Sequence, residues 1–360
     1  MESFRVELGR DSHPVHIGHG ILREAGKLAR AAGLKPGRAA LVTDSKVGKL
    51  FGGEVMRSLE AAGFAPSFIE FPAGEASKSF GVLGDLYDRL VEARLDRSST
   101  LFALGGGVTG DLAGFAAASF LRGIALVQLP TTLTAQVDSS LGGKTGINHK
   151  AAKNLIGAIH QPRLIIADVA TLESLPDREF REGLGEVIKY GAIMDAAMIP
   201  DLEETLPAIL GRDPRQLQAI VSKSLRHKAD VVQSDEKEGD RRKILNFGHT
   251  IGHALEASAG FGAFLHGEAV AAGMVAAMRL SQIHAGLSEE EGRRLIGLIE
   301  MAGLPTAIPA NLSAASLLDA IKLDKKRVDD GVEFVLIDRL GHAFTRKLAF
   351  DQVLDVLTDH

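Results

Sequence analysis

Residues 101–162, LFALGGGVTGDLAGFAAASFLRGIALVQLPTTLTAQVDSSLGGKTGINHKAAKNLIGAIHQP, determine how the rest of the chain is interpreted. They contain two glycine-rich turns, a threonine pair and two lysines among apolar runs. Many glycines between apolar runs are typical of a backbone that approaches a ligand closely. We therefore expect this stretch to bind a ligand.

The first glycine turn, Gly105–Asp111, has the pattern GxGxxG between a predicted strand and a predicted helix. Such a turn directs backbone N–H groups and a helix N-terminus at a phosphate. It lies about 60 residues after the first strand–helix turn, where a dinucleotide fingerprint normally occurs, and no Asp or Glu follows from Leu112 to Val137. A tight structural turn is an equal alternative. Asp44 is the better candidate for ribose hydroxyls, although such an acid is also a common helix N-cap.

Short apolar runs alternate with helical patterns through the first half of the chain. We predict helices over residues 20–33, 47–62 and 80–93 and strands over 39–44, 67–71, 100–104, 125–129 and 164–168. Buried strands alternating with helices predict a mostly parallel sheet covered on both faces.

The second half has mainly 3.6-residue periodicity. Helices are predicted over residues 179–194, 214–232, 250–259, 268–284, 289–302 and 314–323, with one β-hairpin around Leu340-Gly341. The boundary is expected between Asp168 and Pro176, which gives an α/β domain over 1–172 and a mostly helical domain over 173–360.

Composition excludes several classes of protein. The 360 residues carry a net charge of -5 and no cysteine, so nucleic-acid binding, disulfides and thiolate metal ligands are not expected. The N-terminus has no secretory pattern, and the apolar run from Ala269 to Met278 is too short to span a bilayer. We expect a cytoplasmic protein without a membrane or nucleic-acid partner.

Several polar residues of the opening stretch suit an anionic ligand. Lys144 lies in a glycine turn that lacks P-loop spacing, and Lys153 and Arg122 add cations. Each cation alone is more typical of a solvated surface, but together they indicate an anion pocket. In Pro130-Thr131-Thr132, the hydroxyls can bind a ligand, or Thr131 can cap the following helix.

A possible metal site lies in the helical half. His249 and His253 have i, i+4 spacing, His266 follows, and Glu186 has Lys189 one turn further on its helix. Three or four nitrogen and oxygen ligands with an open position are typical of a catalytic zinc-type site. The spacing does not decide which histidines bind.

Six ordered blocks resemble the 3-dehydroquinate synthases, a family of sugar phosphate cyclases. They are GGGVTGDLAGFAAASFLRG, QLPTTLTAQVDSSLGGKTGIN, KNLIGAIHQP, GLGEVIKYG, ILNFGHTIGHALE and LHGEAVAAGM, within a match from about Val6 to Gly341. The resemblance implies a Rossmann-like α/β NAD-binding domain, a mostly α-helical metal-binding domain, one divalent zinc or cobalt ion between them, and a homodimer.

The resemblance also implies roles for individual residues. The metal ligands would be Glu186, His249 and His266, which makes His253 a substrate contact. The NAD contacts would be Asp44, Glu75, Lys78, Gly106, Gly107, Val108, Asp111, Thr131, Thr132, Lys144, Lys153 and Thr171. Substrate and catalytic positions would be Arg122, Asp138, Lys144, Lys153, Asn154, Lys189, Lys228, Arg242, Asn246, His253 and one lysine of Lys325 and Lys326. The chain departs modestly from the family pattern at Ala151-Ala152, which could stiffen the segment that carries Lys153.

The implied substrate is 3-deoxy-arabino-heptulosonate 7-phosphate, an anionic sugar-acid phosphate. The implied reaction is oxidation at C5 with NAD, β-elimination of phosphate, reduction, ring opening and aldol closure to 3-dehydroquinate. His253 would transfer a hydroxyl proton, and its i, i+7 spacing from Asn246 allows both to face one pocket. The substrate's own phosphate is the hypothetical base for the elimination. Alternatives are an iron- or glycerol-type alcohol dehydrogenase, another sugar phosphate cyclase, and a nucleotide-sensing module without catalysis.

Overall fold

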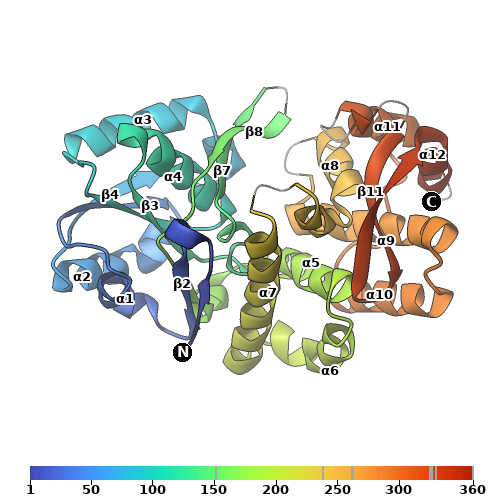
Figure 1. Cartoon of the computed structure of the whole chain (residues 1–360), viewed down its shortest axis with the longest axis horizontal. Coiled ribbons are helices and arrows are strands. Elements are labelled where there is room, and N and C mark those ends of the chain that lie inside the picture. Colours follow the sequence, from blue (N-terminus) through green and yellow to red (C-terminus); the bar gives the residue numbers. More distant parts are fainter. Residues whose placement is uncertain (151, 237–238, 261–262, 324–326, 329–330, 359–360) are drawn as a thin grey trace. The chain divides into compact units, whose positions relative to one another are not determined.

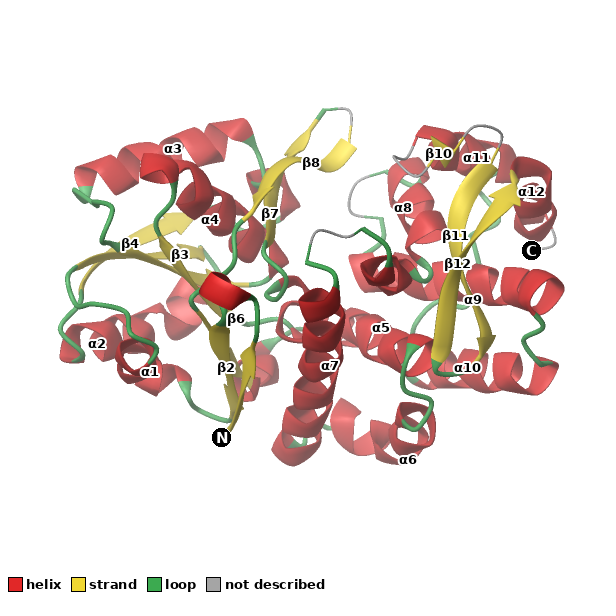
Figure 2. Cartoon of the chain, viewed as in Figure 1, coloured by secondary structure: helices red, strands yellow, loops and turns green. Residues whose placement is uncertain are grey.

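The computed structural model describes residues 1–150, 152–236, 239–260, 263–323, 327–328 and 331–358. Contacts divide the chain into two compact units (Figure 1). The first unit contains Met1–Leu175 and Leu217–Glu236, and the second contains Pro176–Gln216 and Lys237–His360. The expected α/β fold with a mostly helical C-terminal part is confirmed, and Figure 2 shows where helices and strands lie along the chain.

A seven-stranded sheet forms the centre of the first unit. In spatial order its strands are β1 (Glu2–Val6), β2 (His13–Gly18), β9 (Leu164–Asp168), β6 (Ala125–Pro130), β5 (Thr100–Gly105), β3 (Arg38–Asp44) and β4 (Ala65–Phe71). β1 and β2 pair in antiparallel orientation, and the other neighbours are parallel. The predicted parallel sheet is therefore confirmed, with an antiparallel edge that the sequence pattern did not reveal.

Helices cover both faces of this sheet, because alternate strand residues point to opposite sides. On one face Val42 and Leu101 pack with α3 (Phe80–Glu92) and α4 (Gly107–Ser119). On the other face Leu41 and Phe102 pack with α1 (Ala25–Ala31) and α2 (Gly53–Ala61). The short helical turns are η1 (Gly9–Asp11), η2 (Leu22–Glu24), η3 (Gly48–Gly52), η4 (Glu75–Ser77), η5 (Phe120–Arg122), η6 (Ala135–Ser139), η7 (Val169–Ser174) and η8 (Arg241–Asn246).

A separate hairpin, β7 (Lys144–His149) and β8 (Ala152–Ile159), packs against α4. Its register changes between Ile147 and His149, which pair with Ile156 and Ala152, so β8 carries extra residues there. Asn154 lies in this bulge with φ 52°. A bulge bends its strand and redirects a side chain, and here it turns Asn154 away from the regular ladder.

Helix α7 (Pro214–Ser234) contributes most of its length to the first unit. Glu2 on β1 accepts hydrogen bonds from Ser222 Oγ at 2.6 Å and Gln218 Nε2 at 3.1 Å. The Arg226 guanidinium lies 4.7 Å from the ring centroid of Phe4. The chain thus crosses into the second unit at Leu175–Pro176, returns at Leu217 and leaves again after Glu236.

The second unit consists of helices and a small antiparallel sheet. Side chains of four helices, α8, α9, α11 and α12, form its core together with side chains of β11 and β12. The elements are α5 (Asp177–Ile193), α6 (Met198–Leu210), α8 (His249–Ser258), α9 (His266–Ala285), α10 (Glu289–Met301), α11 (Ala314–Leu323), β10 (Arg327–Val328), β11 (Gly331–Arg339), β12 (His342–Ala349) and α12 (Phe350–Thr358). The predicted hairpin around Leu340-Gly341 is confirmed as β11 and β12.

Within the described ranges, none of the helices combines the length and the apolar character needed to cross a bilayer.

Candidate active site

Three helices of the second unit bring one carboxylate and two imidazoles together. Glu186 of α5 is fully buried, and its Oε1 lies 3.5 Å from His249 Nε2 and 3.6 Å from His266 Nε2. Ligands about 2.05 Å from a tetrahedral ion are about 3.4 Å apart, so these separations fit one divalent metal of the zinc or cobalt type. All three donor atoms lie within 4.8 Å of one another.

Glycines explain why the helix backbones come close enough for this arrangement. A Cβ atom on Gly185 would lie 2.8 Å from the carbonyl oxygen of Gly267, where α5 meets α9. Glu186 and His266 are the chain neighbours of these two glycines. The crossing therefore fixes the carboxylate beside the imidazole through backbone contact.

A second group shares His266 and includes a residue that the sequence did not single out. His253, Glu256 and His266 also offer ligand atoms within 4.8 Å of one another. Glu256 Oε2 lies 3.5 Å from His266 Nδ1, and its side chain is 9% exposed. Glu256 is the last residue of the block ILNFGHTIGHALE, which also contains both histidines of α8. Glutamates are common on helices, so its residue type alone did not indicate a role at the site.

The charge around His266 is strongly negative. Burial opposes protonation of the ring, but hydrogen bonds and charge from Glu186 and Glu256 outweigh it and raise the pKa of His266 to about 10. Lys189, 1% exposed, forms an ion pair with Glu186 Oε2 on the same helix. These groups form one electrostatic cluster, in which Glu186 and Lys189 are buried and His266 is partly exposed.

Two residues that were predicted to face one pocket lie on different elements. Asn246 and His253 do not lie on one continuous helix, because Asn246 ends η8 and α8 begins at His249. Between them Gly248 has φ 79°, a left-handed conformation that breaks the helix. Arg242, at 2% exposure, lies on η8, which packs against α5.

In the first unit, predicted NAD residues lie at the carboxyl ends of neighbouring parallel strands. Gly106 and Gly107 follow β5, and a Cβ atom on Gly106 would lie 2.8 Å from Thr132 Cγ2. Thr132 Oγ1 accepts a hydrogen bond from the backbone N–H of Ala135. The capping role that was considered for Thr131 therefore belongs to Thr132. Ligands of open parallel sheets bind outside this edge.

Asp44 and Thr171 already hold local structure at the same edge. Asp44 Oδ1 accepts from Lys46 N at 2.9 Å and Val47 N at 3.1 Å, which is the capping role weighed above. Thr171 is 2% exposed, and its hydroxyl donates to Asp168 O at 2.8 Å. Val108 lies in the first turn of α4, next to Gly107.

A polar network joins four predicted residues with one that was missed. Lys78 Nζ donates to Asp111 Oδ2 at 2.6 Å and contacts Asn154 Oδ1. Asn148, the missed residue, donates to Glu75 Oε1 at 2.7 Å and accepts from Asn154 N at 2.9 Å. Burial raises the pKa of Asp111, and the Lys78 ammonium opposes that rise. Asn148 could be found only by knowing that the bulge faces η4.

The predicted cations are only partly brought together. Lys228 of α7 forms an ion pair with Asp138 at 2.8 Å and donates to its backbone oxygen at 2.7 Å. Lys144 pairs in register with Ile159, six residues beyond Lys153, so the two lysines are separated by roughly 20 Å of strand. The predicted residues Arg122 (exposed, φ 67°) and Lys153 lie on η5 and β8. Lys325, Lys326 and Ala151 lie outside the described residues.

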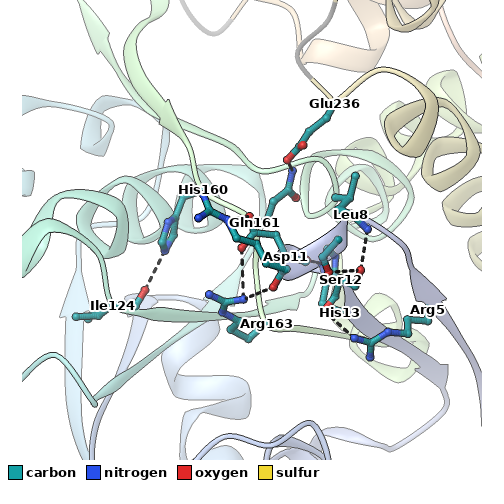
Figure 3. Close-up of polar contacts among 12 residues, drawn as sticks. Arg5, Leu8, Asp11, Ser12, His13, Ile124, His160, Gln161, Arg163 and Glu236 are labelled. Atoms are coloured by element: carbon teal, nitrogen blue, oxygen red, sulfur yellow. Dashed lines mark hydrogen bonds and ion pairs between the residues drawn. The ribbon is translucent and has the colours of Figure 1, made fainter.

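A hollow of about 570 Å³ lies at the opposite edge of the sheet, near the amino ends of the parallel strands. Figure 3 shows polar contacts made by residues of this region. Arg163 donates to Asp11 Oδ1 at 3.4 Å, and Gln161 donates to Glu236 Oε1 at 3.1 Å. Burial lowers the pKa of His160, whose ring contacts Ile124 O. None of the predicted site residues is among those that line it, which are Arg10, Asp11, Arg97, Gly123, Ile124, Ala125, Ile159, His160, Gln161, Arg163 and Glu236.

Comparison with known families matches the chain in two consecutive parts. Residues 68–182 match 3-dehydroquinate synthase N-terminal, and residues 183–327 match 3-dehydroquinate synthase C-terminal. A 3-dehydroquinate synthase of Acidithiobacillus ferrooxidans is 47% identical over 364 residues, covering 100% of this chain and 99% of the relative. A 3-dehydroquinate synthase of Geobacter metallireducens is 46% identical over 358 residues, covering 99% of each.

Solved structures with a similar fold include other cyclases. A 2-deoxy-scyllo-inosose synthase complexed with carbaglucose-6-phosphate, NAD+ and Co2+ has a TM-score of 0.91 at 25% identity, covering 99% of this chain and 100% of the other. The 2-epi-5-epi-valiolone synthase of Streptomyces hygroscopicus, with NAD+ and Zn2+ bound, has a TM-score of 0.88 at 25% identity, with 98% and 97% covered. A glycerol dehydrogenase of Schizosaccharomyces pombe shares the fold at 17% identity and a TM-score of 0.67, with 96% and 88% covered.

Proposed function

Because the chain belongs to the 3-dehydroquinate synthase family, we propose that it converts 3-deoxy-arabino-heptulosonate 7-phosphate to 3-dehydroquinate and phosphate. The observation that carries the proposal is the Glu186–His249–His266 group, whose donor spacing suits one divalent ion. We further propose zinc or cobalt as that ion, NAD as cofactor, a homodimer, and a cytoplasmic location.

The first unit would hold the NAD. The glycine turn after β5 and the start of α4 would bind its phosphates through backbone N–H groups. Lys78, held by Asp111 and Asn154, would present its ammonium to the cofactor, with Glu75 fixed by Asn148. Bound NAD supplies a reversible hydride acceptor, so it is regenerated in each turnover.

The second unit would hold the metal with one carboxylate oxygen and two imidazole nitrogens. When bound, the ion supplies Lewis acidity that lowers the pKa of a substrate hydroxyl. Lys189 would hold the Glu186 carboxylate in place through their buried ion pair. His253, whose ring centroid lies 5.5 Å from that of His249, would take up or return a hydroxyl proton.

Cations would bind the carboxylate and phosphate of the substrate. Lys228 is oriented by Asp138, and Arg242 is almost fully buried on η8. Charge-assisted hydrogen bonds from such preordered cations are strong when water is excluded. Arg122, Lys144, Lys153 and one lysine of Lys325 and Lys326 complete the proposed cations, and Asn154 and Asn246 would add neutral hydrogen-bonding amides.

The main rival is an NAD-dependent alcohol dehydrogenase, since a glycerol dehydrogenase shares the fold. A simple alcohol carries no anionic group, so the buried cations Lys228 and Arg242 would have no anionic substrate group to recognise. Another sugar phosphate cyclase is the second alternative, and the 47% identity to 3-dehydroquinate synthases over the full chain disfavours it.

The test is to incubate the purified protein with the heptulosonate phosphate, NAD and zinc or cobalt. We expect equal amounts of phosphate and 3-dehydroquinate, with NAD needed only in catalytic quantity. Steady accumulation of NADH with an alcohol would support the dehydrogenase. Turnover of a sugar phosphate without a carboxylate, and none of the heptulosonate, would support another cyclase.

A further inference from the structure

The two ring nitrogens of His266 have different carboxylate neighbours. Its Nε2 lies 3.6 Å from Glu186 Oε1, and its Nδ1 lies 3.5 Å from Glu256 Oε2. We propose that Glu256 is a positioning residue, which holds the Nδ1–H of His266 so that Nε2 is presented to the metal. The inference rests on the proposed function only in taking Glu186, His249 and His266 as the metal ligands.

The ring of His249, the other imidazole of the group, is oriented in the same way. His249 Nε2 lies 3.5 Å from Glu186 Oε1, while its Nδ1 lies 3.3 Å from the backbone oxygen of Phe247. Each ring thus has Nε2 on the Glu186 side and an oxygen acceptor beside Nδ1. The acceptor is a carbonyl for His249 and a carboxylate for His266, and a carboxylate partner makes the ligand more basic.

Packing holds Glu256 in this position. It lies seven residues after His249, which is two turns of α8, so one helix supplies both a metal ligand and the outer partner of the other imidazole. Helix α8 is held close to α9 near Gly252, where a Cβ atom would lie 3.1 Å from Ala269 O. The carboxylate is therefore positioned by backbone packing as well as by its own rotamer.

A different use of the same atoms is possible, because His253, Glu256 and His266 could themselves surround an ion. In that arrangement Glu256 would be a direct ligand and Glu186 would not. The fully buried Glu186, with two Nε2 atoms at tetrahedral ligand spacing, favours the first arrangement. The two arrangements predict opposite effects of substituting the two glutamates.

The experiment compares Glu256→Gln, Glu256→Ala, Glu186→Gln and a control, Glu182→Gln. Glu182 is as buried as Glu256 and accepts from the backbone N–H of Gly267, next to His266, and among the described residues it belongs to neither group of possible metal ligands. Zinc and cobalt affinities are measured by competition with a chelator. The Nδ1–H resonance of His266 is followed by NMR in the zinc-loaded, ¹⁵N-histidine-labelled full chain.

We expect Glu256→Gln to weaken zinc binding about 10-fold and Glu256→Ala about 100-fold, the range found for outer-shell partners of metal ligands. The Nδ1–H signal should shift in Glu256→Gln and exchange rapidly in Glu256→Ala. Glu182→Gln should keep this signal. Glu186→Gln should no longer bind one zinc ion per chain. Circular dichroism and melting curves establish that each variant is folded, and the nearly isosteric Glu256→Gln is the variant least prone to misfold.

Three outcomes would overturn the proposal. Zinc affinity of Glu256→Ala within twofold of the wild type would remove any positioning role. Equal losses in Glu256→Gln and Glu182→Gln, with an unchanged Nδ1–H signal, would reduce the effect to general packing. Loss of all zinc in Glu256→Gln with normal binding in Glu186→Gln would make Glu256 a direct ligand. Failure of the proposed reaction is separate, because it appears as absent phosphate release by the wild type while these binding measurements remain interpretable.

Discussion

At the scale of single residues, Glu186 is the carboxylate around which the charged groups of the metal site are arranged. Its Oε1 lies beside two imidazoles, and its Oε2 pairs with the buried Lys189. A buried carboxylate is stable only when its charge is matched. In the metal-free protein Lys189 and a protonated His266 supply that match, so metal binding must displace a proton from His266.

This displacement gives a pH prediction. Because the pKa of His266 is raised to about 10, its ring is protonated at pH 8 in the metal-free protein. Zinc binding at pH 8 should release about one proton from this ring, and the apparent affinity should rise roughly tenfold for each pH unit up to about 10. Calorimetry in buffers of different ionisation enthalpy measures the proton release. An affinity that is independent of pH between 7 and 9 would contradict the assignment.

The same shift affects the stability of the metal-free protein in a defined direction. The folded-state pKa lies above the ordinary value of 6.5, so the stabilisation is fully present below pH 6.5 and is lost as pH rises through about 10. The side chain of His266 is 37% exposed, and solvent therefore screens part of the gain. Metal-loaded protein should not show this loss, because the metal replaces the proton.

At the scale of secondary-structure elements, the sequence predicted the buried strands correctly. It missed the elements whose structure depends on a local irregularity, such as a bulge or a left-handed residue. Strands such as β5 and β9 are continuous apolar runs between helical patterns, which leaves little choice of structure. Hairpin β7–β8 was not predicted, because its glycines and lysines have no alternating pattern and its register is set by a bulge. The break at Gly248 depends on a φ value that letters do not display.

Residue-level predictions had a similar limit. His249 and His253 share helix α8, as their i, i+4 spacing predicted, but which one lies beside Glu186 depends on how α8 and α5 pack against α9. Helix α6 was missed because its prolines, one of them the interior Pro207, disfavour a helix on propensity alone. Tertiary packing overrides such local preferences.

Close helix crossings lead to a prediction with an internal control. A methyl group at Gly273, inside α9, would overlap the carbonyl oxygen of Gly248, whereas Gly297, inside α10, has no atom within 4 Å of the added carbon. Gly273→Ala should destabilise the protein by about 1–3 kcal/mol through overpacking. Gly297→Ala should stabilise it by roughly 0.5–1 kcal/mol, because alanine loses less entropy in a helix.

Urea unfolding of both variants measures the difference. Since Gly248 directly precedes His249, Gly273→Ala should also weaken zinc binding, and Gly297→Ala should leave it unchanged. Equal stability changes in the two variants would show that the crossing of α8 and α9 tolerates a side chain.

At the scale of the whole molecule, the proposed roles are divided between the two units. Every proposed NAD contact lies in Met1–Leu175, and every proposed metal ligand lies in the second unit. Each unit has its own hydrophobic core, so each can hold its ligand groups in place without the other ligand. Binding of cofactor and metal should therefore be separable.

Chelation of the metal tests this separation. Protein treated with a chelator should bind NAD with a Kd within about twofold of the untreated value, because the polar network around Lys78 contains no metal ligand. Turnover should fall at least about 100-fold and return when zinc is added. Calorimetric titration with NAD before and after chelation is the measurement, and loss of NAD binding on chelation would contradict the division of roles.

The glycines beside the ligands have a consequence for protein engineering. In Gly185-Glu186, Gly248-His249 and His266-Gly267 each donor residue adjoins a glycine at a crowded backbone contact. A designer who transplanted only the glutamate and the two histidines onto another helical bundle would leave the donors too far apart, since ordinary side chains keep helix axes 8–10 Å apart. The smallest unit that could be transplanted is therefore the three helix segments with their glycines. The glycines are as necessary to this centre as the donor residues are.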